Sequence, residues 1–221
     1  MDFRLRPSGN SGPLATHIES FAIYQAKDAW TWEHMALTRA RPVAGDARML
    51  ERARAEIATV LTRPHEPTKV TADVLEMRAM VEDAKGGAGL WDLKQTPAGL
   101  VDIEFVAQAL QLAHGAAHPE IIATETEAVL VAAEKAGLFP AKEADVLLSA
   151  LRLYRRCSRS CGSASRASSC PPTRRADYWS GWRAPASCRI SPRWKRMCAR
   201  RRRRCGRRSG AWLGKVAVGK R

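Results

Sequence analysis

The chain has 221 residues, of which 45% are hydrophobic and 27% are charged, and its formal net charge is +15. This charge is distributed unevenly. Residues 1–154 carry 16 basic and 21 acidic side chains, whereas residues 155–221 carry 21 basic side chains and one acidic one, and all six cysteines. The first part has the length of an ordinary domain and no thiol, which excludes a disulfide framework or a cysteine nucleophile within it.

No stretch reaches the roughly 18 to 20 apolar residues that a bilayer span requires, and no basic lead followed by an apolar run opens the sequence. We therefore expect a cytoplasmic protein. Residues 155–221 contain Leu, Ile, Val or Phe only at Ile190, Leu213, Val216 and Val218, a content typical of chains that stay disordered.

Residues 1–6 alternate strictly between apolar and polar, which predicts a β-strand with Asp2, Arg4 and Arg6 on one face. Two prolines and two glycines within residues 7–13 should end this strand in a turn. Apolar residues at helical spacing then predict a helical segment over 17–40, with a break near Asp28.

The remaining periodic stretches predict a series of further helices. Asp46 is expected to cap the first of them, and Thr96 and Pro97 to form the cap and first residue of the third. Glycines at 115 and 137 should end two of them. The predicted helices cover 47–61, 70–85, 97–115, 124–136 and 141–154, so the fold class is mainly α.

Asp2, Arg4 and Arg6 on one strand face form the first cluster that could carry chemistry. A carboxylate can hold Mg²⁺ while guanidinium groups neutralise phosphate oxygens, a combination suited to nucleotidyl transfer. The alternative is an exposed strand edge with mixed charges, and the pattern alone favours this alternative.

A second cluster lies on one predicted helix, where Trp30, Glu33 and His34 share a side and Arg39 and Arg41 follow. Aromatic core packing with a solvated ion pair is the structural alternative to a functional role, and the pattern alone favours this alternative. His34 has no partner at metal-ligand spacing, so we expect His34 to lie on the helix surface and not to bind a metal.

The third cluster contains Asp102 and Glu104, which are two positions apart on a predicted helix. Their side chains should point roughly 200° apart around the helix axis, so they cannot act as a paired acid and base. At least one of them is expected to serve a structural salt bridge or a helix cap.

Taken together and in this order, these clusters resemble the bifunctional glutamine synthetase adenylyltransferase/deadenylylase family. The Trp-Thr-Trp-Glu-His string that contains Glu33 resembles the C-terminal, adenylylating half of that family. The matching strings are Asp2 to Gly9 with Gly12, Trp30 to His34, Leu37 to Arg41, Gly45-Asp46, Leu93 to Gln95 and Gly99 to Phe105.

The resemblance implies that residues 1–62 are the end of a polymerase-β-type nucleotidyltransferase domain, beginning on the remnant of its last strand, together with the helices that follow it. It also implies a helical bundle shared with the PII uridylyltransferases over 66–154. The expected function is that of a multifunctional enzyme of nitrogen metabolism, which transfers AMP from ATP to a tyrosine of glutamine synthetase and removes it. Glutamine synthetase and the PII signal protein are the implied partners.

The resemblance also assigns roles to single residues. Asp2 would be a catalytic carboxylate that binds Mg²⁺, Arg4 and Arg6 would neighbour the triphosphate, and Ser8 and Gly9 would form a turn near the nucleotide. Because the Gly-Ser…Asp-x-Asp motif that supplies the other metal carboxylates is absent, we expect this chain alone to be catalytically incomplete. The residues expected to support the domain junction are Glu33, Arg39 and Arg41, and those expected to support the bundle are Lys94, Gly99, Asp102 and Glu104.

The likeness stops after Tyr154, and we interpret residues 155–221 as an Arg/Cys/Ser-rich product of out-of-frame translation. Sequencing the DNA across the Tyr154 codon tests this interpretation. The alternative function is a non-catalytic helical module with a basic nucleic-acid-binding tail, whose phosphate binding would weaken steeply with salt in a mobility-shift titration. A zinc site is a third possibility, but the cysteine spacing lacks the two-residue gaps of zinc ribbons.

Overall fold

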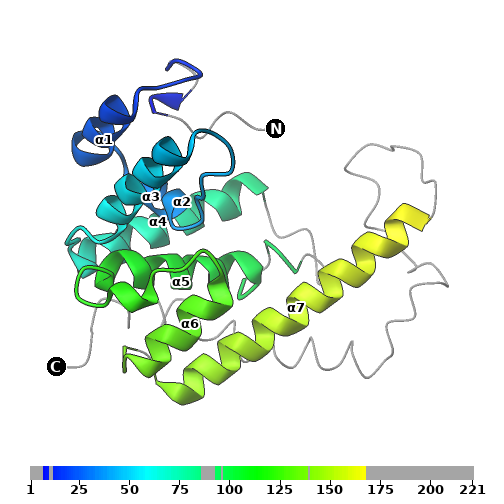
Figure 1. The fold of residues 1–221 in the computed structure, drawn as a ribbon. Helices are drawn as coiled ribbons and strands as arrows, with labels where there is room; N and C mark the ends of the chain where they lie inside the picture. The colour runs from blue at the N-terminus through cyan, green and yellow to red at the C-terminus, as the bar shows by residue number, and fades with distance from the viewer. Residues whose placement is uncertain (1–6, 10–11, 86–92, 96, 139, 168–221) are drawn as a thin grey trace, which may run out of the picture.

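The computed structural model describes residues 7–9, 12–85, 93–95, 97–138 and 140–167. These residues form seven α-helices and one short 3-10 helix (Figure 1). In chain order they are α1 (Ile18–Lys27), α2 (Thr31–Leu37), α3 (Ala47–Leu61), α4 (Pro67–Lys85), α5 (Leu100–His114), η2 (Pro119–Ile121), α6 (Thr126–Lys135) and α7 (Ala141–Ala167).

The hydrophobic core lies around α5, which packs against α2, α4, α6 and α7. α1 and α3 lie on the other side of α2, at the N-terminal end of the body, while the later half of α7 extends beyond the packed helices (Figure 1). The apolar stripe predicted on this central helix is confirmed, since Ile103, Ala107 and Leu110 are almost completely buried. The described residues are thus mainly helical, as the sequence predicts.

Several local signals in the sequence act as predicted. The helical segment over 17–40 breaks after Lys27, and α2 starts at Thr31, as the expected break near Asp28 requires. The Asp46 side chain accepts a hydrogen bond of 3.0 Å from the Arg48 N–H and caps α3. Gly115 follows the last residue of α5, and Gly137 adopts a left-handed φ of 71° just after α6.

Three predicted helix boundaries are wrong. The helix predicted to start at residue 70 begins at Pro67, since proline is well suited to the first helical position. The helix with Gly99 as its N-cap begins at Leu100 rather than at Pro97, because Ala98 has a left-handed φ of 60° and cannot continue a helix. The last helix continues to Ala167, thirteen residues beyond the predicted end. The change in composition at Tyr154 therefore does not coincide with the end of a helix.

One further turn of α7 after Tyr154 remains packed on the body. Cys157 is buried and contacts the same small apolar cluster as Leu153 and Leu93. Arg155 lies 3.7 Å from a carboxylate oxygen of Glu125. The expected disorder is therefore wrong for the first residues of the tail, and it stays a prediction for residues 168–221, which lie outside the described part of the chain.

None of the described helices has the length and apolar content that a membrane crossing requires. The predicted strand over residues 1–6, with Asp2, Arg4 and Arg6, and the predicted loop over 86–89 lie outside the described residues.

Candidate functional site

The turn that contains Ser8 and Gly9 is tied to the start of α2. The Tyr24 hydroxyl lies 3.0 and 3.1 Å from the two carboxylate oxygens of Glu33 and also bonds the backbone of Ser8. Glu33 in turn accepts a 2.9 Å hydrogen bond from the backbone N–H of Trp30, which caps α2. A single carboxylate thus orders the helix start and, through Tyr24, positions the Ser8 turn.

The backbone of this turn is left-handed at two consecutive residues, with φ angles of 59° at Ser8 and 52° at Gly9. Glycine adopts such an angle readily, whereas serine adopts it at a cost in energy. A Cβ atom at Gly12 would lie 2.1 Å from the Pro7 carbonyl oxygen, so this position requires glycine. The turn is therefore held tightly immediately after the segment that contains Asp2, Arg4 and Arg6.

The two tryptophans of the Trp30–His34 run do not pack in the core. Trp30 is 70% exposed and Trp32 is 38% exposed. His34, in contrast, is buried, and its Nε2–H donates to the Gln25 carbonyl oxygen at 3.2 Å. The sequence-based expectations of aromatic core packing and of a surface histidine are both wrong. The Gln25 carbonyl oxygen of α1 and the His65 ring lie against His34, whereas the tryptophan side chains remain exposed.

His34 forms a pair with His65, which precedes α4, with ring centroids 5.2 Å apart. Burial is the main cause that lowers the pKa of both imidazoles, and the neighbouring His34 lowers the pKa of His65 further. The Arg63 guanidinium, which donates to the Gln25 carbonyl oxygen at 3.0 Å, disfavours a charge on either ring. This junction between α1, α2 and α4 therefore keeps both histidines neutral.

We expect the free energy of unfolding to fall as the pH is lowered from about 7 to 5. A histidine whose pKa is lowered by folding stabilises the protein above its unfolded pKa, and this stabilisation is lost as the pH falls through the folded pKa. Urea denaturation at several pH values measures the slope. His34→Gln should flatten it, whereas His17→Gln, at a side chain that is 93% exposed, should leave it unchanged. Equal slopes in all three proteins would contradict this expectation.

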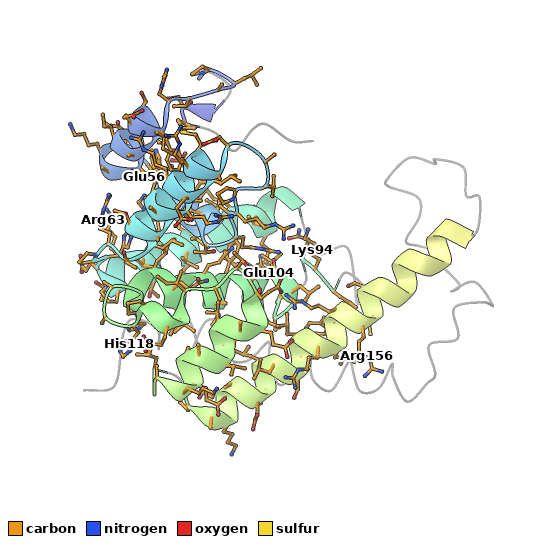
Figure 2. All side chains as sticks on the ribbon, viewed as in Figure 1. Glu56, Arg63, Lys94, Glu104, His118 and Arg156 are labelled. Atoms are coloured by element: carbon orange, nitrogen blue, oxygen red, sulfur yellow. The ribbon has the colours of Figure 1, made fainter. Side chains whose placement is uncertain are left out.

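Arg39 and Glu104, from two different motifs of the sequence, contact each other directly. The Arg39 Nη1 atom lies 3.2 Å from Oε1 of Glu104, and the two side chains are 51% and 23% exposed. This ion pair connects the end of α2 to α5. In Figure 2, Glu104 lies near the middle of the body, and Lys94 lies toward the side from which α7 projects.

Asp102 points to the other side of α5 and is buried against Arg78 of α4. Its carboxylate accepts hydrogen bonds from the Arg78 Nε–H and from the backbone N–H of Ala98. Arg78 also donates to the Gln95 carbonyl oxygen at 3.0 Å, and its Nη1 lies 3.3 Å from Glu82. The divergence of Asp102 and Glu104 and the structural salt bridge are thus confirmed.

The segment that includes Lys94 and Gly99 supplies the N-terminal cap of α5. The carbonyl oxygens of Leu93 and Lys94 accept hydrogen bonds of 2.9 and 3.2 Å from the N–H groups of Leu100 and Val101. These bonds satisfy N–H groups that the first turn of a helix leaves without intrahelical partners. The motif around Lys94, Gly99 and Asp102 therefore acts as a structural unit in this part of the chain.

Sequence reasoning did not single out Arg78, although a signal was present. Arg78 follows Val70 and Val74 at four-residue spacing, and all three are buried. An arginine in the apolar stripe of a helix indicates a buried acidic partner.

The implied Mg²⁺ is assigned to Asp2 and not to the described helices. Among the described residues no group of three or more His, Cys, Asp or Glu side chains is arranged to hold a metal ion. Asp2, the predicted ligand, lies outside the described residues. The role of Asp2 as a metal ligand therefore stays a prediction.

Two family models match separate parts of the chain. The model described as glutamate-ammonia ligase adenylyltransferase matches residues 1–56, and the model described as GlnD PII-uridylyltransferase matches residues 75–159. Two curated relatives are each named bifunctional glutamine synthetase adenylyltransferase/adenylyl-removing enzyme. Over 154 residues, 70% of this chain, identity is 50% to the protein from Bradyrhizobium sp. (strain BTAi1) and 49% to that from Xanthobacter autotrophicus (strain Py2).

The chain is similar to the glutamine synthetase adenylyltransferase family over these 154 residues. It spans about a sixth of the length of these curated relatives, since the matching segment is 16% of each. The match to the second family model runs to residue 159, five residues beyond the change in composition, in agreement with the continuous helix α7. The resemblance indicated by the sequence motifs is thereby confirmed. The ion pair between Arg39 and Glu104 joins the two matched segments.

Proposed function

We propose that this chain is the helical portion of a glutamine synthetase adenylyltransferase, whose role is to position the nucleotide-facing end of a catalytic domain. The observation that carries the proposal is the close identity over 154 residues to enzymes with this name. The contacts of the described residues support it. The turn that contains Ser8 and Gly9 is bonded through Tyr24 to Glu33, and α2, which carries Glu33, packs on the core helix α5.

The reaction proposed for the intact enzyme is the transfer of AMP from ATP to a tyrosine of glutamine synthetase, with release of diphosphate, and the removal of that AMP. Mg²⁺ would be held partly by Asp2, and Arg4 and Arg6 would neutralise the phosphates. Nucleotidyl transfer of this kind uses two metal ions, and a lone carboxylate cannot position both. We therefore propose that the chain alone lacks this activity, and that glutamine synthetase and the PII signal protein are partners of the intact enzyme.

A pair of assays tests the positioning role. The full chain alone should incorporate no labelled AMP into purified glutamine synthetase above a no-enzyme control. A chimera of the Bradyrhizobium relative, in which the matching residues of this chain replace the aligned 154 residues, should keep AMP transfer within about tenfold of the parent. The physical reason is that the helices provide positioning, which the chimera restores.

The control is the same chimera with Asp102→Ala, which should lose both its cooperative melting and its activity. A chimera that melts like the parent but transfers no AMP would overturn the positioning role. Incorporation that rises with the concentration of the full chain alone would overturn catalytic incompleteness.

The alternative of a nucleic-acid-binding tail rests on residues 168–221, which lie outside the described part of the chain, and it stays a prediction. No contact of the described residues favours it over the enzyme fragment.

A further inference from the structure

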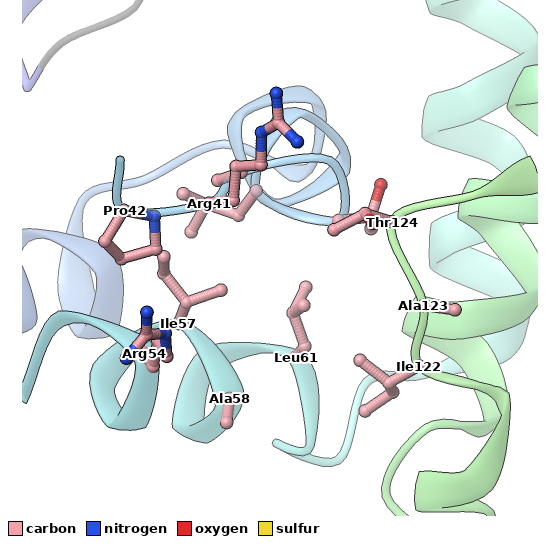
Figure 3. A pocket seen from close by; sticks show the side chains of 12 residues that line it. Arg41, Pro42, Arg54, Ile57, Ala58, Leu61, Ile122, Ala123 and Thr124 are labelled. Atoms are coloured by element: carbon pink, nitrogen blue, oxygen red, sulfur yellow. The ribbon is translucent and has the colours of Figure 1, made fainter. Parts of the chain in front are cut away.

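A pocket lies between the end of α2, one side of α3 and the segment before α6. Its volume is about 290 Å³ (Figure 3). Its lining comes from three segments that are far apart in the sequence: 37–42, 54–61 and 122–124.

The lining is apolar at the base and cationic at the edge. Ile57 and Leu61 line the α3 side, and Ile122 and Ala123 lie opposite them (Figure 3). The only ionisable side chains among the residues that line it are Arg41 and Arg54. An apolar cavity with a few polar groups is the usual composition of a small-molecule site, and its volume is at the lower end of the usual range.

The two guanidinium groups are available to an anion. Arg41 is exposed and makes no ion pair with any described residue, and its guanidinium projects at the rim of the pocket, away from the apolar base (Figure 3). Arg54 lies 3.3 Å from Glu51, but both side chains are more than half exposed, so this pair is weak and exchangeable. The Leu37–Arg41 motif contains two arginines. Arg39 pairs with Glu104, whereas Arg41 makes no ion pair with a described residue.

We propose that this pocket binds a small organic anion with an unbranched apolar body, whose carboxylate contacts the Arg41 guanidinium at the rim. Planar guanidinium groups match the geometry of a carboxylate, and the apolar body would cover Leu61 and Ile122. The absence of acidic residues from the lining removes the repulsion that would exclude an anion. A cationic or purely polar molecule of the same size has no favourable contacts there.

Hexanoate is a suitable probe, measured by the chemical shifts of the Ile57, Leu61 and Ile122 methyl groups in the full chain. Hexanoate should shift these signals saturably, and hexylamine should not. Acetate carries the charge without the apolar body, and hexanol carries the body without the charge, so both should bind at least about fivefold more weakly. Acetate also controls for attraction by residues 155–221, whose net charge is +20.

Two variants and a matched control assign the site. Arg41→Gln should weaken hexanoate binding about fivefold, because a charge-assisted hydrogen bond at an exposed rim is lost. Ala58→Phe should abolish binding by filling the pocket, and Ala58 is an exposed lining residue whose enlargement disturbs no core contact. Arg48→Gln removes a 96% exposed arginine of the same helix that does not line the pocket, and it should change nothing.

Three results would each overturn the proposal: equal affinities for hexanoate and hexylamine, an unchanged affinity in Arg41→Gln, or normal binding in a folded Ala58→Phe variant. A loss of affinity in Arg48→Gln equal to that in Arg41→Gln would also overturn it, because the effect would then be one of net charge. Circular dichroism of each variant confirms that the helices are intact.

Discussion

Replacing Asp102 by Ala should lower the free energy of unfolding by about 3 to 5 kcal/mol, because it leaves the buried Arg78 guanidinium without its carboxylate. Both side chains are about nine-tenths buried, so water cannot replace the lost partner. The backbone N–H of Ala98 loses its acceptor at the same time. Urea denaturation of the full chain, followed by circular dichroism, measures the loss.

Glu104→Ala is the matched control, two residues along the same helix. Its partner Arg39 is half exposed, so the loss should stay below about 1 kcal/mol. The double variant Arg78→Met with Asp102→Leu should be more stable than Asp102→Ala alone, since no charge then remains buried. Equal losses for Asp102→Ala and Glu104→Ala would show that burial does not distinguish these two ion pairs.

The difference between Asp102 and Glu104 also shows what the sequence can specify. Their divergence around α5 follows from helix geometry alone, and so do the caps at Asp46 and Gly115, because each depends on residues a few positions apart. The identity of each partner does not follow in this way. Arg78 is 24 residues from Asp102, and only the packing of α4 on α5 brings them together.

The wrong expectations have the same origin. Thr96 and Pro97 carry the local signal of a helix start, but the buried Asp102 carboxylate holds the Ala98 N–H, and the left-handed φ of Ala98 delays the helix to Leu100. Similarly, no local pattern could bury His34, because its surroundings come from α1 and from the segment before α4. Tertiary contacts overrode propensity at both places.

Gly115→Ala should cost more stability than the same change at Gly137, although both glycines follow a helix. A Cβ atom at Gly115 would lie 2.4 Å from the Gln111 carbonyl oxygen and 2.8 Å from that of Leu61, so the ends of α5 and α3 would have to separate. We expect a loss of about 2 to 3 kcal/mol from this overpacking. At Gly137 a Cβ atom meets nothing within 4 Å, and only its φ of 71° is unfavourable, which should cost about 1 kcal/mol.

Asparagine separates the two causes, because it tolerates the left-handed region better than alanine does but is larger. Gly137→Asn should therefore be milder than Gly137→Ala, whereas Gly115→Asn should be at least as damaging as Gly115→Ala. Urea denaturation of the four variants in the full chain gives this ranking, and the reverse order at either site would sink the corresponding explanation. Since a Cβ atom at Gly115 would also lie 3.3 Å from the Ile122 side chain, this glycine sets the approach of two residues that line the pocket, Leu61 and Ile122.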